Sequence, residues 1–465
     1  NHFLSKIRYS HFKPFLCLTV SFLLYFMDLI NRDLLHIWHP CSQMKDYESF
    51  PPLVVTKAYG PYIELNDGRK IIDAISSWWC KSLGHNHPRL KAALLAQLEH
   101  FEHVIFANST YEVIIQLSEK LSQLCPGLDK VFYARESYSA VEIALKMSLH
   151  AQKLRGENQR TQFTALKNAY HGETFMALGL SDLGLYRQAY EAHLIQPKFI
   201  ENIPYVNSTT DPLWDDCSCI WPTIEEQLER QAAHLAAIIV EPIVQGAAGM
   251  RIYSQDFLRR LRTWTQAHGI YLIADEIMTG LGRTGYALAS EHAQIKPDFI
   301  CLSKGLTSGW LAMSAVLTHS NIYDLFYADY AIEKNFLHSH TFSGNALAAA
   351  VALECLHVLE DEKIYKQVQK KDFFLRKLMQ EVAIRTERLT NIRIIGAIAA
   401  ADLCLSEKEK NQRIGYQIFQ AAIKLGAWLR PLGNTIYWLP PLNTPLPVLE
   451  ELKEITITAI KQTLA

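Results

Sequence analysis

The chain has 465 residues, of which 49% are hydrophobic and 20% are charged, and its formal net charge is −1. This composition is typical of a globular protein long enough for two domains. The near-neutral charge gives no electrostatic reason to expect nucleic acid or an anionic membrane as a partner. Nine cysteines without the spacing of a disulfide framework favour a reducing compartment. We therefore expect a cytoplasmic protein.

Two pairs of residues have a spacing that resembles metal ligands, Cys217-x-Cys219 and His36-x-x-His39. Neither pair has two further ligands at zinc spacing nearby, so we expect no metal site.

Residues 1–26 differ in character from the rest of the chain. Phe15 to Met27 is a mostly apolar run that follows three basic residues. It is shorter than the roughly 20 residues that span a membrane, and no small-residue cleavage site of a signal peptide follows it. We interpret 1–26 as an atypical extension, translated from upstream of a natural start at Met27. A targeting segment and a packed extra helix are the alternatives.

From Asp28 onward the chain reads as an α/β enzyme. In chain order we expect a hairpin at 62–68, helices at 88–101, 111–124 and 140–149, a strand at 236–240, a helix at 257–267, strands at 270–274 and 299–302, and then helices at 346–360, 363–386, 410–425 and 448–464 with strands at 393–396 and 435–438. Apolar strands separated by helices predict a mostly parallel sheet covered on both faces. We expect a large domain over 80–335 and a smaller α+β domain from 27–79 with 336–465.

Two charged residues follow buried strands in this layout. Asp275 ends the strand at 270–274, and Lys304 follows the strand at 299–302 after one serine. Ligands of such sheets bind beyond the carboxyl ends of the strands. A lysine amine can condense with an aldehyde, and a carboxylate can keep a pyridine nitrogen protonated. The pair therefore indicates a pyridoxal-phosphate (PLP) site; a plain salt bridge is the alternative.

The segments around this pair favour the cofactor interpretation. Small residues surround Lys304 and would let a flat cofactor approach the backbone. Tyr170, in Tyr170-His-Gly172, offers an aromatic face for a ring. Thr341 lies just before a helix that begins at Ala346, and the N-terminus of a helix suits a phosphate.

Four further motifs follow one another in order along the chain. They are His36-Ile-Trp-His-Pro40, Ser76-Ser-Trp-Trp79, Glu241-Pro-Ile-Val-Gln-Gly-Ala-Ala-Gly-Met250 and Arg430-Pro-Leu-Gly-Asn-Thr-Ile-Tyr-Trp-Leu-Pro-Pro441. With Tyr170-His-Gly172, Asp275-Glu276, Lys304 and Thr341, the chain resembles the class III (fold type I) PLP-dependent aminotransferases. Within them it is similar to the biotin-pathway subfamily that converts 8-amino-7-oxononanoate to 7,8-diaminononanoate. The resemblance runs from about Asp28 to the C-terminus.

The resemblance implies a role for each matching residue. Lys304 would bond PLP, Asp275 would pair with the pyridine nitrogen, and Tyr170 would pack on the ring and line the substrate pocket. Ser137 and Tyr138 take positions of the phosphate cup, the loop that holds the cofactor phosphate. Trp78, Ser339 and Arg430 would contact substrate, with Arg430 on its carboxylate. Thr341 would reach the phosphate of a second subunit's cofactor, which implies a homodimer with shared sites. The implied reaction has two half-reactions, one with the amino donor and one with the keto acid, and this alternation predicts ping-pong kinetics.

Three departures from the subfamily pattern bear on these roles. In the phosphate cup, Ser137 replaces a glycine and Tyr138 replaces a serine, so we expect weaker PLP binding and, if φ is positive there, backbone strain. Cys41 stands where the best-known biotin enzymes have a tyrosine. Ser339-His340 stands where they have Gly-Pro. These last two changes leave the amino donor open between S-adenosylmethionine, our first choice, and another amine such as lysine.

Three other functions remain compatible with the sequence. The first is a class III transaminase of ω-amino acids or diamines, which the Trp78-Trp79 and Arg430–Pro441 motifs disfavour. The second is a PLP aminomutase or decarboxylase, which shares the fold and the lysine. The third is a PLP-fold protein that has lost its cofactor through the altered cup.

Overall fold

The computed structural model describes residues 29–464. The segment 1–26, with its apolar run, lies outside the described residues. The chain divides into two compact units, of which one ends at Lys57 and also contains Glu64–Arg69, while the other contains Ala58–Ile63 and everything from Lys70 onward. In the described range, we find no helix with the length and apolar character that crossing a membrane requires. The predicted division into domains 80–335 and 27–79 with 336–465 stays a prediction.

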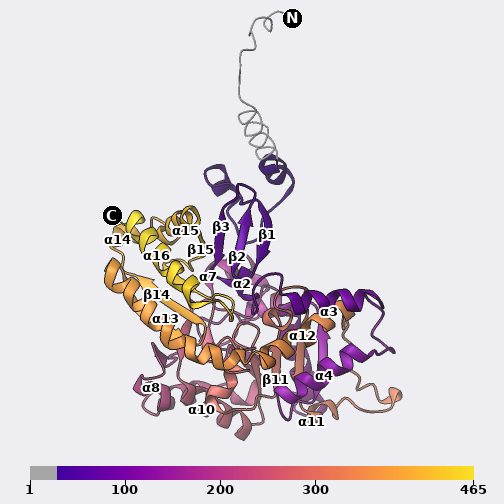
Figure 1. The fold of residues 1–465 in the computed structure, drawn as a ribbon. Coiled ribbons are helices and arrows are strands. Elements are labelled where there is room, and N and C mark those ends of the chain that lie inside the picture. The colour runs from indigo at the N-terminus through magenta and orange to yellow at the C-terminus, as the bar shows by residue number, and fades with distance from the viewer. Residues whose placement is uncertain (1–28, 465) are drawn as a thin grey trace, which may run out of the picture. The chain divides into compact units, whose positions relative to one another are not determined.

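A six-stranded sheet forms the centre of the larger unit (Figure 1). Its strands, in spatial order, are β4 (Lys130–Ala134), β12 (Ser314–Thr318), β11 (Phe299–Leu302), β10 (Tyr271–Asp275), β7 (Leu235–Val240) and β5 (Gln162–Ala165). The strands β11, β10, β7 and β5 are parallel, and β12 runs antiparallel to both of its neighbours. The predicted mostly parallel sheet is confirmed, and β12 is the strand that departs from it.

The two faces of this sheet are buried by different helices. Alternate residues of β11, such as Ile300 and Leu302, pack with α3 (Pro88–Leu98), α4 (Glu112–Leu124) and α12 (Ala346–Asp361). Phe299 and Cys301 face the opposite way and pack with α5 (Ser137–Leu154). Both faces are apolar because a parallel sheet of this kind is covered on each side. Further along the sheet, α9 (Trp221–Glu229) and α10 (Gln255–Ala267) join the core.

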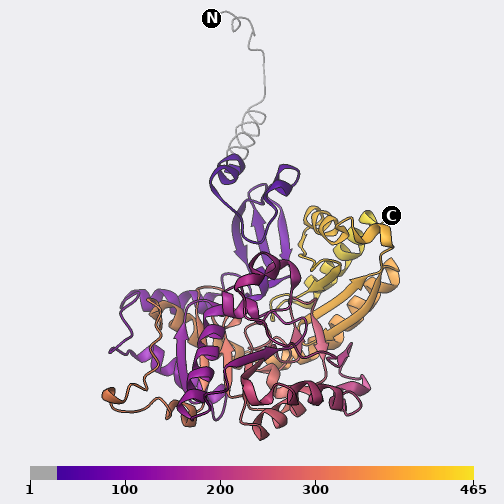
Figure 2. The same ribbon diagram turned by 180° about the vertical axis from the view of Figure 1, so that it is seen from behind.

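A second, three-stranded sheet follows α12 in the chain. It contains β13 (Leu389–Ile395), β14 (Ile398–Leu403) and β16 (Thr435–Trp438), all antiparallel. The helices α13 (Ile364–Thr386), α15 (Ile414–Leu425) and α16 (Leu446–Thr463) pack with it around the buried Trp438. Figure 2 shows these orange strands beside the yellow C-terminal helices. The expected helices and the strands at 393–396 and 435–438 are confirmed, whereas β14 was not predicted.

Shorter elements complete the chain. They are η1 (Met44–Glu48), β1 (Val55–Tyr59), β2 (Tyr62–Leu65), β3 (Lys70–Asp73), α2 (Ser76–Trp79), α6 (Phe175–Gly179), α7 (Gly184–Arg187), η2 (Gln188–His193), β6 (Tyr205–Val206), α8 (Pro212–Asp215), η3 (Ala232–His234), β8 (Val244–Gln245), β9 (Arg251–Tyr253), η4 (Ala289–Ala293), η5 (Lys304–Thr307), α11 (Ser320–Tyr323), η6 (Tyr330–Ile332), α14 (Glu407–Lys410) and β15 (Ala427–Trp428). The predicted turn after Tyr62 is present, since the Gly68 amide donates to the Leu65 carbonyl at 3.1 Å.

A buried ion pair fixes the start of the two strands that carry Asp275 and Lys304. Asp298 precedes β11, and its carboxylate accepts two hydrogen bonds from Arg262 of α10, at 2.6 and 3.1 Å. The same carboxylate accepts the amide of Leu272 in β10 at 2.8 Å. The bidentate geometry ties the helix and both strands together, so removal of Asp298 would leave the Arg262 charge buried without its partner.

Substitution Asp298→Ala should therefore lower the free energy of unfolding by about 3–5 kcal/mol, the cost of breaking a buried pair from one side. Glu226→Ala is the matched control, because Glu226 pairs with Arg230 on the exposed surface of α9. Such a pair contributes at most about 1 kcal/mol. Urea unfolding of the two variants measures the difference, and equal losses would contradict this role of Asp298.

Candidate active site

Three ionisable residues gather at the carboxyl edge of the central sheet. Asp275 is the last residue of β10 and lies opposite Cys301 in the register of β11. Lys304 follows β11 by two residues, at the start of η5. Glu241 directly follows β7, which is the other neighbour of β10. Parallel strands end at the same edge, so the three residues converge although they are far apart in sequence.

Lys304 is held in an unusual backbone conformation. Its φ is 41°, in the left-handed region that side chains disfavour. Its amine lies 4.9 Å from the centre of the Trp79 ring. Burial lowers the pKa of the Lys304 amine below its ordinary value of 10.5, while the charges of Asp275 and Glu241 act in the opposite direction. The lowered pKa increases the fraction of neutral amine, the form that attacks an aldehyde.

Asp275 is buried and oriented by a histidine. Its Oδ2 lies 2.9 Å from His171 Nδ1, and its Oδ1 accepts the Ile277 amide at 3.2 Å. The other ring nitrogen of His171 is buried without a hydrogen-bond partner within residues 29–464. Sequence reasoning named His171 only as the middle of a motif; the contact with Asp275 was not predicted.

Glu241 links the Tyr170 segment to this edge. Its carboxylate accepts the Tyr170 amide at 3.1 Å and the Gly246 amide at 2.9 Å. Burial raises the pKa of Glu241 to about 7, although the neighbouring His171 acts in the opposite direction. Tyr170 therefore lies next to His171 and Glu241, and its role at the cofactor ring stays a prediction. Its hydroxyl donates to Glu173 at 2.9 Å.

Two tryptophans connect Lys304 to Arg430. The guanidinium carbon of Arg430 lies 4.0 Å from the centre of the Trp78 ring, a cation–π contact. Trp79 donates from its indole nitrogen to the Tyr437 hydroxyl at 3.0 Å and is buried under the Lys304 amine. The structure thus places Arg430 on Trp78, and Lys304 on the next residue, Trp79. The roles of Trp78 and Arg430 toward a substrate stay predictions.

The phosphate cup lies at the start of α5. Ser137 is the first residue of this helix, and neither Ser137 nor Tyr138, both in the described part of the chain, has a positive φ. Strain was expected here only if φ were positive, and this condition is not met: the cup residues adopt ordinary helical geometry. Tyr138 contacts the Tyr170 segment closely, since a Cβ added at Gly172 would lie 2.7 Å from the Tyr138 Cβ.

The charges beside the cup neutralise each other. Arg135 Nε lies 3.1 Å from Glu136 Oε1, and its guanidinium lies 5.6 Å from the centre of the Phe342 ring. Arg135 thereby offsets the negative charge that Glu136 brings to the helix N-terminus. The first amides of a helix have no acceptor within the helix, so those of Ser137 and Tyr138 remain suited to a phosphate.

Two predicted residues lie away from the Lys304 cluster. Ser339 and Thr341 are exposed. The Thr341 carbonyl is 2.9 Å from His103 Nε2, and the hydrogen bonds and ring contacts found among residues 29–464 join neither residue to Lys304 or Asp275. Their roles at a second subunit's site stay predictions.

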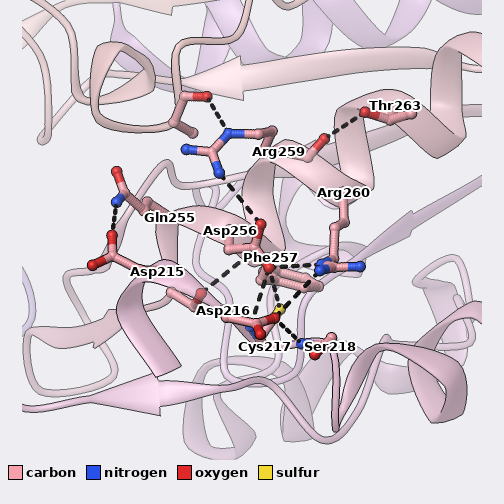
Figure 3. Close-up of polar contacts among 12 residues, drawn as sticks. Asp215, Asp216, Cys217, Ser218, Gln255, Asp256, Phe257, Arg259, Arg260 and Thr263 are labelled. Carbon is pink, nitrogen blue, oxygen red and sulfur yellow. Dashed lines mark hydrogen bonds and ion pairs between the residues drawn. The ribbon is translucent and has the colours of Figure 1, made fainter. Parts of the chain in front are cut away.

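The metal-like pair Cys217-x-Cys219 has a structural explanation. Cys217 is buried, and its amide and thiol both contact Asp256 Oδ2, at 3.1 and 3.5 Å, whereas Cys219 is exposed (Figure 3). Burial raises the pKa of the Cys217 thiol to about 11, with the Asp256 charge adding to the effect. Asp256 also accepts a 2.6 Å hydrogen bond from Arg260. No group of three or more metal-binding side chains occurs between residues 29 and 464.

The residues at the sheet edge fit PLP at each of its reactive ends. A partly neutral Lys304 amine can bond the aldehyde. The buried Asp275 carboxylate can hold a proton on the ring nitrogen. The amides at the start of α5 can face the phosphate. The match is weakest at Tyr138, whose side chain is larger than the serine of the subfamily.

Comparisons with known proteins agree with this geometry. Residues 43–464 match the family described as Aminotransferase class-III. An adenosylmethionine-8-amino-7-oxononanoate aminotransferase from Helicobacter pylori is 38% identical over 419 residues, which cover 89% of this chain and 93% of that protein. One from Synechococcus elongatus is 38% identical over 414 residues, covering 87% and 94%.

Two solved structures extend the comparison to the fold. An adenosylmethionine-8-amino-7-oxononanoate aminotransferase from Methanocaldococcus jannaschii superposes with a TM-score of 0.86 at 29% identity, covering 93% of this chain and 98% of that one. An amine transaminase from an uncultivated Pseudomonas species, in its PLP-bound form, has a TM-score of 0.82 at 29% identity, covering 92% and 98%. The predicted fold type I architecture is thus confirmed. The chain therefore belongs to the class III aminotransferases, and its cofactor is pyridoxal 5′-phosphate.

Proposed function

We propose that this enzyme transfers an amino group to 8-amino-7-oxononanoate, giving 7,8-diaminononanoate in biotin biosynthesis, with S-adenosylmethionine as the donor. The observation that carries the proposal is the chain of contacts from Lys304 through Trp79 and Trp78 to Arg430. The two tryptophans form an apolar wall between Lys304 and Arg430, and this arrangement supports a long keto acid whose carboxylate would reach Arg430. The relatives from Helicobacter pylori and Synechococcus elongatus carry the name of this activity.

The chain's own side chains supply binding and proton transfer. When bound, PLP supplies an electron-accepting ring that carries the amino group between two substrates. Asp275 would hold a proton at the ring nitrogen, and His171 would keep that carboxylate in place. The Lys304 amine would take a proton from the donor carbon that bears nitrogen in the first half-reaction, and would deliver a proton to the former keto carbon of the acceptor in the second. Arg430 binds the far carboxylate, while Trp78 and Trp79 exclude water from the space between.

Three finer statements belong to the same proposal. The enzyme is a homodimer, because the exposed Ser339 and Thr341 would complete a second subunit's site. Its partners are otherwise small molecules, and it works in the cytoplasm. A transaminase of ω-amino acids or diamines is the second candidate function, supported by the similarity to the amine transaminase. A diamine gives Arg430 no carboxylate at the far end, whereas an ω-amino acid gives it one, so Arg430 disfavours only the diamines.

The proposal is tested by offering wild-type protein, saturated with PLP, 8-amino-7-oxononanoate together with S-adenosylmethionine or lysine. We expect 7,8-diaminononanoate, detected by mass spectrometry, with S-adenosylmethionine as donor. Lys304→Ala, which keeps the fold but lacks the amine, should give only the background of the enzyme-free reaction. Product from lysine alone would correct the donor. No product from either donor would overturn the substrate, and full activity of Lys304→Ala would overturn the role of Lys304.

The altered cup makes a separate prediction about cofactor affinity. The double substitution Ser137→Gly with Tyr138→Ser should lower the dissociation constant for PLP by about fivefold, because glycine permits closer approach and the serine hydroxyl adds a hydrogen bond. Titration of the apoprotein with PLP, followed by absorbance, measures this constant. Tyr190→Ser, at an exposed tyrosine of η2, is the control and should leave it unchanged. Equal or weaker binding by the double variant would contradict the proposal that Ser137 and Tyr138 weaken the site.

A further inference from the structure

The segment that carries both tryptophans is a left-handed turn. Its residues Ser76, Ser77, Trp78 and Trp79 have φ values of 50°, 44°, 71° and 74°. Such φ values are routine for glycine, but other residues visit them as single residues rather than in a run. None of the four is glycine, so surrounding contacts must stabilise the turn.

A buried aspartate supplies most of these contacts. Asp73 Oδ1 accepts the amides of Ile75 at 3.3 Å and Ser77 at 2.9 Å. Its Oδ2 accepts the Ser77 hydroxyl at 2.8 Å and lies 2.8 Å from His85 Nε2. Asp73 is 1% exposed and His85 is 9% exposed. The pair is therefore shielded from water, and a charge-assisted hydrogen bond is stronger in such surroundings than in water.

The turn is also held by contacts with Leu439, the residue that follows β16, and with Gly246. The Ser76 hydroxyl donates to the Leu439 carbonyl at 2.7 Å. Trp79 packs against Gly246, where an added Cβ would lie 3.2 Å from the indole ring. These two contacts and the Asp73 bonds stabilise the left-handed conformation of the backbone. Trp79 is then buried beneath the Lys304 amine, and Trp78 points out with 42% of its surface exposed.

The exposed Trp78 ring is the surface on which Arg430 rests. Stacking on the Trp78 indole restricts the guanidinium of Arg430 to one plane and so fixes the direction of the N–H groups at its edge. A side chain ordered before binding loses less conformational entropy when the substrate arrives. The orientation of Trp78 therefore determines how far the Arg430 side chain is ordered before a substrate carboxylate binds.

We propose that the buried Asp73–His85 pair is a positioning device which, by holding the left-handed Ser76–Trp79 turn, sets Trp78 under Arg430 and gives the enzyme its preference for keto substrates that carry a carboxylate. This inference rests on the proposed role of Arg430 in substrate binding. No hydrogen bond or ring contact described for residues 29–464 joins Asp73 or His85 to Lys304. They act on specificity through the turn.

The test compares two substrates, a keto acid that the wild-type enzyme accepts and the primary amide of the same compound. The measured quantity is the ratio of their kcat/KM values. Asp73→Asn keeps the size of the side chain but replaces the acceptor that faces His85 and the Ser77 hydroxyl with a donor. We expect the ratio to fall by about tenfold, mostly through a higher KM for the acid. Arg430→Ala should lower the same ratio.

The control is Asp67→Asn. Asp67 also accepts the amide of a residue two positions on, Arg69, at 3.0 Å, but it is exposed and belongs to the smaller unit. It should leave the ratio unchanged. The dissociation constant for PLP is the second readout, because a general loss of structure would raise that constant in Asp73→Asn, whereas a change in carboxylate preference would not.

A ratio that stays at the wild-type value in Asp73→Asn, or an equal fall for acid and amide, would overturn the inference. If that variant does not fold, Ser77→Ala decides. It removes only the Ser77 hydroxyl, which donates to Asp73 at 2.8 Å and lies 3.4 Å from His85 Nε2, and it should lower the ratio about threefold; an unchanged ratio overturns the inference there too. Failure of the proposed function is distinguishable, because it would appear in the wild-type enzyme as no turnover of 8-amino-7-oxononanoate.

Discussion

The convergence of three parallel strands at one edge of the central sheet is the constraint on which this active site depends. The register of β7, β10 and β11 fixes where each strand ends and so brings Glu241, Asp275 and Lys304 together. Any helix or loop can be varied around such an edge, but a shift in register would reverse the alternation of side chains and separate the three groups. The Asp298–Arg262 pair stabilises the opposite end of β10 and β11, where these two strands begin.

Around this edge the chain accepts conformations that cost free energy. A left-handed residue other than glycine costs roughly 1–2 kcal/mol, and the run from Ser76 to Trp79 has four such residues, with Lys304 a fifth. Buried hydrogen bonds to Asp73 and Leu439 offset this cost. Strain of this kind persists only where the surroundings over-determine the backbone. The strained turn lies next to the Lys304 amine. This position indicates that the geometry of the two tryptophans serves the active site although it lowers stability.

Much of this arrangement could be predicted from the sequence because it is local. Lys304 and Asp275 directly follow apolar strands, and the helices after Ala346 have clear apolar periodicity. Contacts between distant segments could not be derived in this way, since neither periodicity nor spacing encodes the Asp73–His85 pair, the His171–Asp275 contact or the stacking of Arg430 on Trp78. The left-handed turn was also missed, because its sequence contains no glycine. Strain at Ser137 was expected from the replaced glycine, but the start of α5 keeps ordinary helical φ there.

The central claim is that Lys304 is the residue that bonds the cofactor. Borohydride reduces the bond between a lysine and an aldehyde to a stable amine, which survives digestion and can be located by mass spectrometry. Reduction of the PLP-loaded protein should add the cofactor's mass to the peptide that contains Lys304 and to no other lysine peptide. Attachment at a different lysine, or no attachment at saturating PLP, would contradict the account.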